Sequence, residues 1–140
     1  MAMNKFARIS LLSVIALMLA CASAVAQTQA QMNQDACRKY EETDAEMNKV
    51  YQQVLNEYKK DTAFIQKLKT AQRLWVAFRN AHIESLYPKP NKLAAYGSIH
   101  PTCRCLALTE ITTARIEALK RWIKGGEEGD TCSGSIKIKN

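Results

Sequence analysis

Four of the five cysteines, and a histidine close to two of them, have the spacing that most restricts their chemistry. Cys103 and Cys105 stand two residues apart and follow His100, while Cys37 and Cys132 lie far away on either side. A CxC pair beside a histidine suits copper or zinc. The N-terminal sequence instead indicates export, and an even number of cysteines in an oxidising compartment favours disulfides. We therefore expect two disulfides and no metal site.

The N-terminus has the features of a secretory signal peptide. Lys5 and Arg8 precede an apolar run over 11–20 that is too short to span a bilayer, and Ala24-Val25-Ala26 follows it. We expect a signal peptide over 1–26 and one domain over 27–140, without a transmembrane helix in the mature chain. The alternative is acylation at Cys21, which ends a sequence similar to a lipoprotein box. Either route predicts a periplasmic, secreted or membrane-anchored protein.

Hydrophobic periodicity predicts three long helices after a flexible lead-in over 27–34. Residues from Cys37 to Tyr58 are spaced three and four apart, which predicts a first helix over about 35–60. A second begins after a cap at Asp61 or Thr62 and ends near Tyr87. A third runs from about residue 102 to the two glycines at 125–126. The apolar seam expected on the second helix consists of Leu68, Ala71, Trp75, Phe78 and His82.

The segment 88–102 is predicted to be a long loop containing one short helical turn over 91–96, ended by Gly97. Loops of this length are uncommon in compact domains unless they have a function. The loop is therefore a candidate binding surface, and the alternative is an ordered cover over the end of the bundle. Its candidate contact residues are Lys92, Tyr96, Gly97, Ser98 and His100.

Short connections make neighbouring helices antiparallel, so we expect an all-α, antiparallel three-helix bundle with a long loop before the third helix. Cys37 then lies at the same pole as Cys103 and Cys105. Those two are too close in sequence to pair with each other, which leaves two connectivities open. We favour Cys37 with Cys105, because both lie on buried stripes, and Cys103 with Cys132, which would tether the C-terminal tail by a disulfide.

Charged residues on apolar stripes form the second constellation. Asp44, Arg79 and Arg115 fall one per helix on or beside the seams, where an unpaired charge costs several kcal/mol. We expect the carboxylate to bridge one or both guanidinium groups, with Gln72 and Asn48 as further partners. This network would set the helix register, and an anion site is the alternative.

The chain lacks the sequence signatures of common catalytic sites. It has no serine elbow, phosphate loop or zinc helix motif, and His82 stands alone. We predict a non-catalytic protein without a cofactor. The net charge of +7 falls to about +5 without the two basic residues of the signal peptide. A basic pole is expected from Lys59, Lys60, Lys67, Lys120, Arg121 and Lys124, which either offset helix dipoles or bind anionic envelope polymer or lipid, with no sign of nucleic-acid binding.

Beyond these patterns, a further set of residues is spread over 37–122. Its core is Asn48, Tyr51, Trp75 and Phe78, and its other members are Asp44, Met47, Gln72, Arg73, Arg79-Asn80-Ala81, Gly97-Ser98, Cys105-Leu106, Thr109, Arg115 and Leu119. Together these residues resemble the LprI-like lysozyme-inhibitor family of small exported bacterial domains.

This resemblance implies a helical fold and a function as an inhibitor of lysozyme, or a partner among other envelope proteins. Members often carry a cysteine just after the arginine-containing element, where Ile83 stands here. The pairing of Cys103 with Cys132 would be this protein's substitute. Lysozymes of the animal type are cationic, so an acidic patch around Glu41, Glu42 and Glu46 is the surface expected to face the enzyme.

Overall fold

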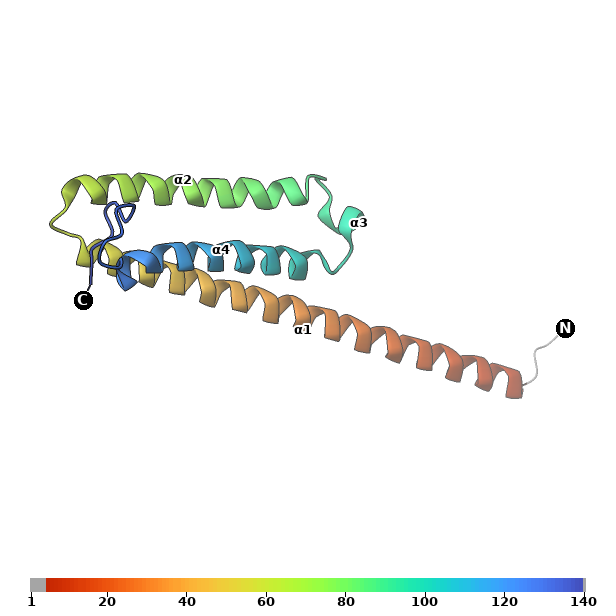
Figure 1. The fold of residues 1–140 in the computed structure, drawn as a ribbon. Coiled ribbons are helices and arrows are strands. Elements are labelled where there is room, and N and C mark those ends of the chain that lie inside the picture. Colours follow the sequence, from red (N-terminus) through yellow and green to blue (C-terminus); the bar gives the residue numbers. More distant parts are fainter. Residues whose placement is uncertain (1–4, 140) are drawn as a thin grey trace.

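The computed structural model describes residues 5–139, with side chains described from residue 28 onward, and this part of the chain is all-helical without strands. α1 and α4 run in the same direction and pack closely along the length of α4, while α2 runs antiparallel and stays further from both (Figure 1). The all-α prediction is confirmed. The helices are α1 (Lys5–Glu57), α2 (Thr62–Leu86), α3 (Lys92–Tyr96) and α4 (His100–Lys124).

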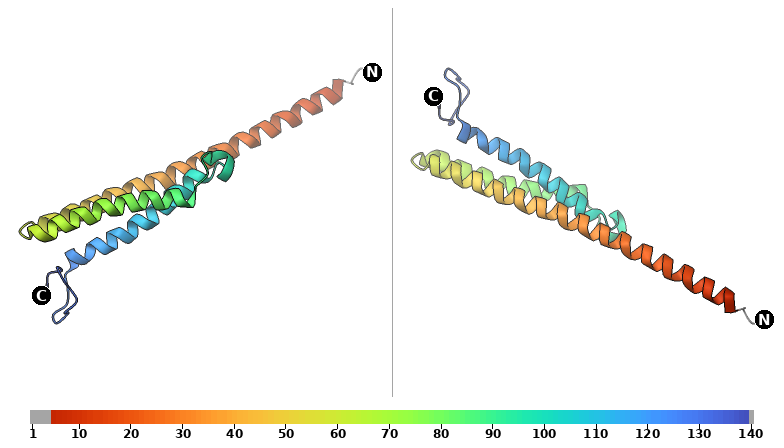
Figure 2. Two further views of the ribbon diagram at one scale, coloured as in Figure 1. Left: turned by 90° about the horizontal axis from the view of Figure 1, so that it is seen from above. Right: turned by 90° about the horizontal axis from the view of Figure 1, so that it is seen from below.

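α1 is longer than the periodicity predicted, and its N-terminal part extends beyond the other helices (Figure 2). The prediction of a flexible lead-in over 27–34 was wrong, because residues of good helix propensity continue the helix there and Gln31 donates to Asp35 at 3.1 Å one turn later. The side chains of the predicted signal peptide over 1–26, including Cys21, lie outside the described part. The part of the chain whose side chains are described contains no helix with the length and hydrophobicity that a membrane span requires.

The core lies where α1, α2 and α4 meet. The stripe predicted over 37–58 contributes Met47, Val54 and Tyr58 to it; Val54 is fully buried and Tyr58 is 1% exposed. Burying an aliphatic or aromatic side chain of this kind contributes about 1.5–3 kcal/mol. Partly buried aromatic residues, including Phe64 and Trp122, close the core at the α1–α2 turn. The buried members of the cluster are Met47, Val50, Val54, Tyr58, Leu68, Ile116 and Leu119.

The prediction of which face of α2 is buried was wrong. Leu68 is buried as expected, but Ala71 and His82 face solvent and Phe78 is 57% exposed. The buried residues of α2 are Leu68, Gln72, Arg79 and Ile83. The helix has turned its polar row inward because Gln72 and Arg79 find hydrogen-bonding partners on the other two long helices, which removes the cost of burying them.

Capping residues set the start of α2 and the ends of α3 and α4. The Asp61 carboxylate accepts from the backbone N–H of Phe64 at 2.9 Å and caps α2, as predicted. Gly97, with φ of 73°, ends α3. Gly125, with φ of 88°, ends α4, and a Cβ there would lie 2.9 Å from the Lys137 carbonyl oxygen.

The C-terminal tail, residues 125–139, folds back on the end of the helices through a tyrosine rather than a disulfide. The Tyr58 hydroxyl donates to the Trp122 carbonyl at 3.1 Å and accepts from the backbone N–H of Lys137 at 3.0 Å. Gly126 forms an isolated parallel bridge with Ile138. The tail therefore stays at the pole where α4 ends.

Replacing Tyr58 with phenylalanine is expected to loosen the tail around Lys137 and to lower the free energy of unfolding by about 1–2 kcal/mol, because the part-buried hydrogen bonds to the Trp122 carbonyl and from the Lys137 N–H are both lost. Amide hydrogen exchange over residues 125–139 measures the release. Tyr51→Phe, within α1, is the control and should leave the tail protected. Equal exchange in both variants would show that Tyr58 does not hold the tail.

Candidate binding surface

The pole where α4 begins is fixed by the disulfide between Cys37 and Cys105, whose Cα atoms are 4.9 Å apart. This pairing confirms the first predicted disulfide. The second was wrong, because Cys103 and Cys132 are free thiols. Cys103 lies in the first turn of α4, whereas the tail stays at the other end of that helix, about 30 Å away at 1.5 Å per residue. Within the described chain, no group of three or more His, Cys, Asp or Glu residues could hold a metal ion.

Arg79 of α2 and Asp44 of α1 form an ion pair below this pole. Arg79 Nη1 donates to Asp44 Oδ1 at 2.6 Å, and the Arg79 side chain is 9% exposed. The guanidinium also lies over the rings of Tyr40 and Trp75, at 5.7 Å and 5.2 Å from their centroids. Asn48 Nδ2 donates to the second carboxylate oxygen of Asp44 at 3.3 Å. The pair joins α2 to α1.

Arg115 of α4 meets α2 through an amide instead of a carboxylate. Arg115 Nε donates to Gln72 Oε1 at 2.9 Å, and Gln72 Nε2 lies 3.5 Å from Met47 Sδ. Burial lowers the pKa of Arg115 from its usual value. Among the described residues no carboxylate lies within ion-pair distance of Arg115, so Asp44 pairs with only one of the two guanidinium groups.

Three of the four residues expected at the motif core surround this network. Trp75 is half-buried, and the Arg115 guanidinium carbon lies 5.8 Å from its ring centroid. Tyr51 is also half-buried; burial raises its pKa, and the nearby Arg115 charge opposes that change. Asn48 contacts the Asp44 carboxylate from the exposed side of α1. Phe78 instead points outward and stacks on His82.

The predicted binding loop is anchored to α1 by a residue that the sequence patterns did not single out. Asn33 Nδ2 donates to the Ser98 carbonyl at 3.3 Å. Its Oδ1 accepts from the N–H and the hydroxyl of Thr102, at 3.2 Å and 2.6 Å. Ile99 at the N-cap of α4 has no side chain for capping, so Asn33 supplies the cap from another helix. The lack of a capping side chain at position 99 is the signal in the sequence that could have indicated a cap from another segment.

Aromatic rings stiffen the loop from within. The Tyr96 ring lies 5.3 Å from that of Tyr87 and 5.7 Å from that of His100. Lys92 Nζ donates to the Tyr87 carbonyl and pairs with Glu84 at 3.1 Å. These contacts join the end of α2, α3 and the start of α4 into one unit.

The loop residues predicted to bind a partner line two neighbouring cavities. One of about 340 Å³ includes Lys92, Gly97, Ser98 and His100 together with Asn33. Tyr96 lines the other, of about 580 Å³. Leu93 lies in the wall of the first cavity and is 69% exposed. We call Lys92, Leu93, Tyr96, Gly97, Ser98 and His100 the α3 surface.

Asn33→Ala is expected to loosen the α3 surface and to lower the free energy of unfolding by about 1–2 kcal/mol, because it removes the cap of α4 and the bond to Ser98. Asn33→Asp keeps the acceptor for Thr102 and should retain most of the stability. Gln34→Ala, at an exposed neighbouring position, is the control. Urea unfolding and hydrogen exchange over 97–103 report the change. If Asn33→Ala matched Gln34→Ala, the proposed anchor would be wrong.

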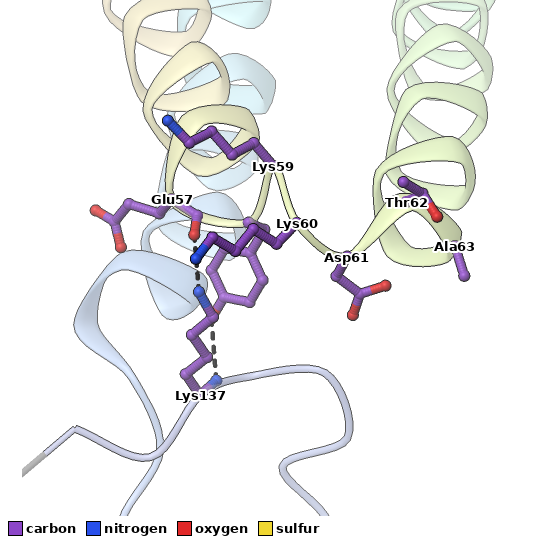
Figure 3. Close-up of a pocket in the computed structure, with 8 residues that line it drawn as sticks. Glu57, Lys59, Lys60, Asp61, Thr62, Ala63 and Lys137 are labelled. Carbon is purple, nitrogen blue, oxygen red and sulfur yellow. Dashed lines mark hydrogen bonds between the residues drawn. The ribbon is translucent and has the colours of Figure 1, made fainter.

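The opposite pole carries the predicted basic residues at the α1–α2 turn. A cavity of about 700 Å³ lies between the end of α1, the start of α2 and the tail, and Figure 3 draws the residues that line it. Lys59 and Lys60 are exposed there, and Lys137 Nζ donates to the Glu57 carbonyl at 2.7 Å. Lys120 is paired with Glu46 at 3.2 Å and with Glu117 at 3.1 Å. The charge of Lys120, which was expected to add to the basic pole, is therefore neutralised. The same ion pair neutralises Glu46, which was expected in the acidic patch.

The described chain is thus an all-helical domain closed by a disulfide, with an exposed loop anchored to α1. A sequence model described as "Lysozyme inhibitor LprI" matches residues 21–119, which is more than half of the chain. The protein belongs to the LprI lysozyme inhibitor family, and the resemblance noted from the sequence is confirmed. No curated protein and no solved structure matches this chain significantly.

Proposed function

We propose that this protein is an exported, non-catalytic lysozyme inhibitor and that it contacts the enzyme through the α3 surface. The family membership supports lysozyme as the partner. The observation that carries the choice of surface is the anchoring of an exposed loop at three points, by Asn33, by the stacked rings of Tyr96 and His100, and by the nearby disulfide.

Anchoring matters because a flexible loop loses conformational entropy when it binds, at about 0.5–1.5 kcal/mol for each immobilised side chain. A loop already held in one conformation avoids most of that cost. Leu93 adds an exposed apolar side chain at the centre of the surface, next to a cavity that a partner's side chain can enter. A buried apolar anchor within a polar rim is the usual composition of an energetic hot spot.

The charges of the loop also fit a muramidase. Most glycoside hydrolases, the class of enzyme to which lysozymes belong, hold two carboxyl groups in the active-site cleft. Lys89 is exposed beside the α3 surface and offers a cation to those groups. Glu41 and Glu42 are exposed on α1 and complement a cationic enzyme outside the cleft, whereas Glu46 is paired with Lys120.

Export and processing are part of the proposal. Cleavage after Ala26 leaves Asn33 and its hydrogen bonds to Ser98 and Thr102 within the mature chain. The same holds for acylation at Cys21. Mass spectrometry of protein recovered from the producing cell distinguishes a chain that begins at Gln27 from a lipidated one.

A matched pair of leucine substitutions tests the surface. Leu93 is 69% exposed on α3 and Leu74 is 61% exposed on α2, so replacing either with aspartate should change stability little. Leu93→Asp is expected to weaken inhibition of lysozyme at least about tenfold, as loss of a hot-spot residue does. Leu74→Asp should inhibit like the original protein. Equal inhibition by both variants would exclude the α3 surface as the contact.

The basic pole supports a second candidate function, the binding of anionic cell-wall polymer or lipid. Lys59 and Lys60 are exposed beside the cavity of Figure 3 and form no ion pair among the described residues. Binding of this kind weakens steeply with salt. A Lys59→Gln/Lys60→Gln variant should lose binding to anionic vesicles while retaining inhibition of lysozyme, and an affinity independent of salt would contradict this function.

A further inference from the structure

A small cavity between α2 and α4, away from the α3 surface, has an arrangement of residues that the inhibitor function does not use. Its volume is about 280 Å³. Apolar side chains of Phe64, Leu68 and Trp122 form its walls, and Ala71 stands at its exposed side. The Trp122 indole N–H is already satisfied by Ser135, to which it donates at 3.1 Å.

Two cations and no carboxylate line this cavity. Arg115 is one of them, and its Nη2 is buried without a hydrogen-bond partner among the described residues. Lys67, exposed at the rim, is the other. A partly buried guanidinium usually has a carboxylate partner, because an uncompensated charge in such surroundings costs several kcal/mol. Gln72 and the ring of Trp75 compensate the Arg115 charge only in part.

We propose that this cavity binds a small apolar carboxylate, with the carboxylate accepting hydrogen bonds from Arg115 and the apolar part lying against Phe64, Leu68 and Trp122. The two cations that line the cavity supply the charge that such a ligand requires. The volume accommodates a ligand of several carbon atoms, such as a short fatty acid or the C-terminal residue of a peptide.

The ionised carboxylate is the feature that the proposal specifies, so uncharged isosteres are the decisive probes. Hexanoate and hexanol are titrated into the purified, oxidised protein, with calorimetry and tryptophan fluorescence as readouts. Hexanoate is expected to bind saturably, with an affinity at least about tenfold higher than that of hexanol, because a charge-assisted hydrogen bond is lost with the alcohol. Equal affinities, or no saturation by hexanoate at about 20 mM, would overturn the proposal.

Variants then test the assignment to this cavity. Arg115→Gln is expected to lower hexanoate affinity at least about tenfold, while Arg104→Gln, an exposed arginine elsewhere on α4, leaves it unchanged. Because Arg115 also contacts Gln72, a second variant avoids the buried network: Ala71→Phe fills the cavity from its exposed side and should abolish binding in a protein that still unfolds cooperatively. Hexanoate binding that persists in both variants would contradict the assignment.

Titration with N-acetylleucine and with its amide distinguishes the two sources of such a ligand, a free apolar acid and the C-terminus of a peptide. Binding of the acid but not the amide supports the C-terminus of a peptide as a ligand. Binding of hexanoate alone supports a free apolar acid. Binding of the amide as strongly as the acid would contradict the role of Arg115. None of these measurements depends on inhibition of lysozyme, so this proposal and the proposed function succeed or fail separately.

Discussion

Replacing Asp44 with alanine is expected to lower the free energy of unfolding by about 3 kcal/mol, because it leaves the buried Arg79 guanidinium without its carboxylate. Removal of one member of a buried ion pair costs about 3–5 kcal/mol. The Asp44 side chain is 32% exposed, so water compensates part of the loss and the lower end applies. Urea unfolding monitored by circular dichroism measures the change.

A double-mutant cycle separates the loss of the pair from the cost of the stranded charge. Arg79→Met in the Asp44→Ala background removes that charge and should recover part of the stability. Asp35→Ala breaks the exposed pair between Asp35 and Arg38, which has a distance of 2.8 Å, and should cost no more than about 1 kcal/mol. If Asp44→Ala cost no more than Asp35→Ala, the pair would not hold α2 in place.

Removing the disulfide is expected to have the largest effect on stability. The bond joins residues separated by 68 positions, and closing a loop of that length restricts the unfolded chain by about 4 kcal/mol in the chain-entropy account. The Cys37→Ala/Cys105→Ala protein should therefore unfold at a much lower urea concentration. Its α3 surface should also exchange amide hydrogens faster, since the bond lies near Pro101 at the start of α4.

The matched control uses the other two cysteines. Cys103 and Cys132 are free thiols, so Cys103→Ser/Cys132→Ser should unfold close to the original midpoint. Titration of the unfolded, unreduced protein with a thiol reagent should find both of them reactive. A strong loss of stability in this control, together with no reactive thiols, would show that these cysteines are bonded to each other after all.

Much of the fold could be predicted because it depends on local signals. The three- and four-residue spacing from Cys37 to Tyr58 predicted the packed face of α1, and Asp61, Gly97 and Gly125 marked helix ends that the structure has at those positions. Each of these signals acts within a few residues of the chain, so it is readable without knowledge of tertiary contacts.

The errors concern contacts between distant segments. An apolar seam on α2 predicted that Phe78 would be buried, but Arg79 has a carboxylate partner on α1 and takes the buried position. Residues 27–34 show no hydrophobic periodicity, so the sequence did not predict a helix there. Their contact with the rest of the fold depends on one polar side chain, Asn33, which caps α4 near residue 100. The tail was expected to reach Cys103, yet a hydrogen bond to the Tyr58 hydroxyl and two more to Glu57 keep it at the other pole.

The same distinction holds for the binding surface. The length of the 88–102 segment and its Gly97 indicated a candidate surface, and four of its five candidate residues share one cavity. What the sequence did not reveal is that the surface is anchored from α1 by Asn33. That anchor turns a long loop into a rigid surface, which is the property that the proposed inhibition requires.

The central claim is that this protein inhibits a lysozyme by direct binding. Its most direct test is a titration of the purified, oxidised protein into an animal-type lysozyme acting on bacterial cell walls, at low salt and at about 0.15 M ionic strength. We expect activity to fall in proportion to added protein and to be lost near equimolar ratio at both salt concentrations. Full lysozyme activity in the presence of excess protein would contradict the claim.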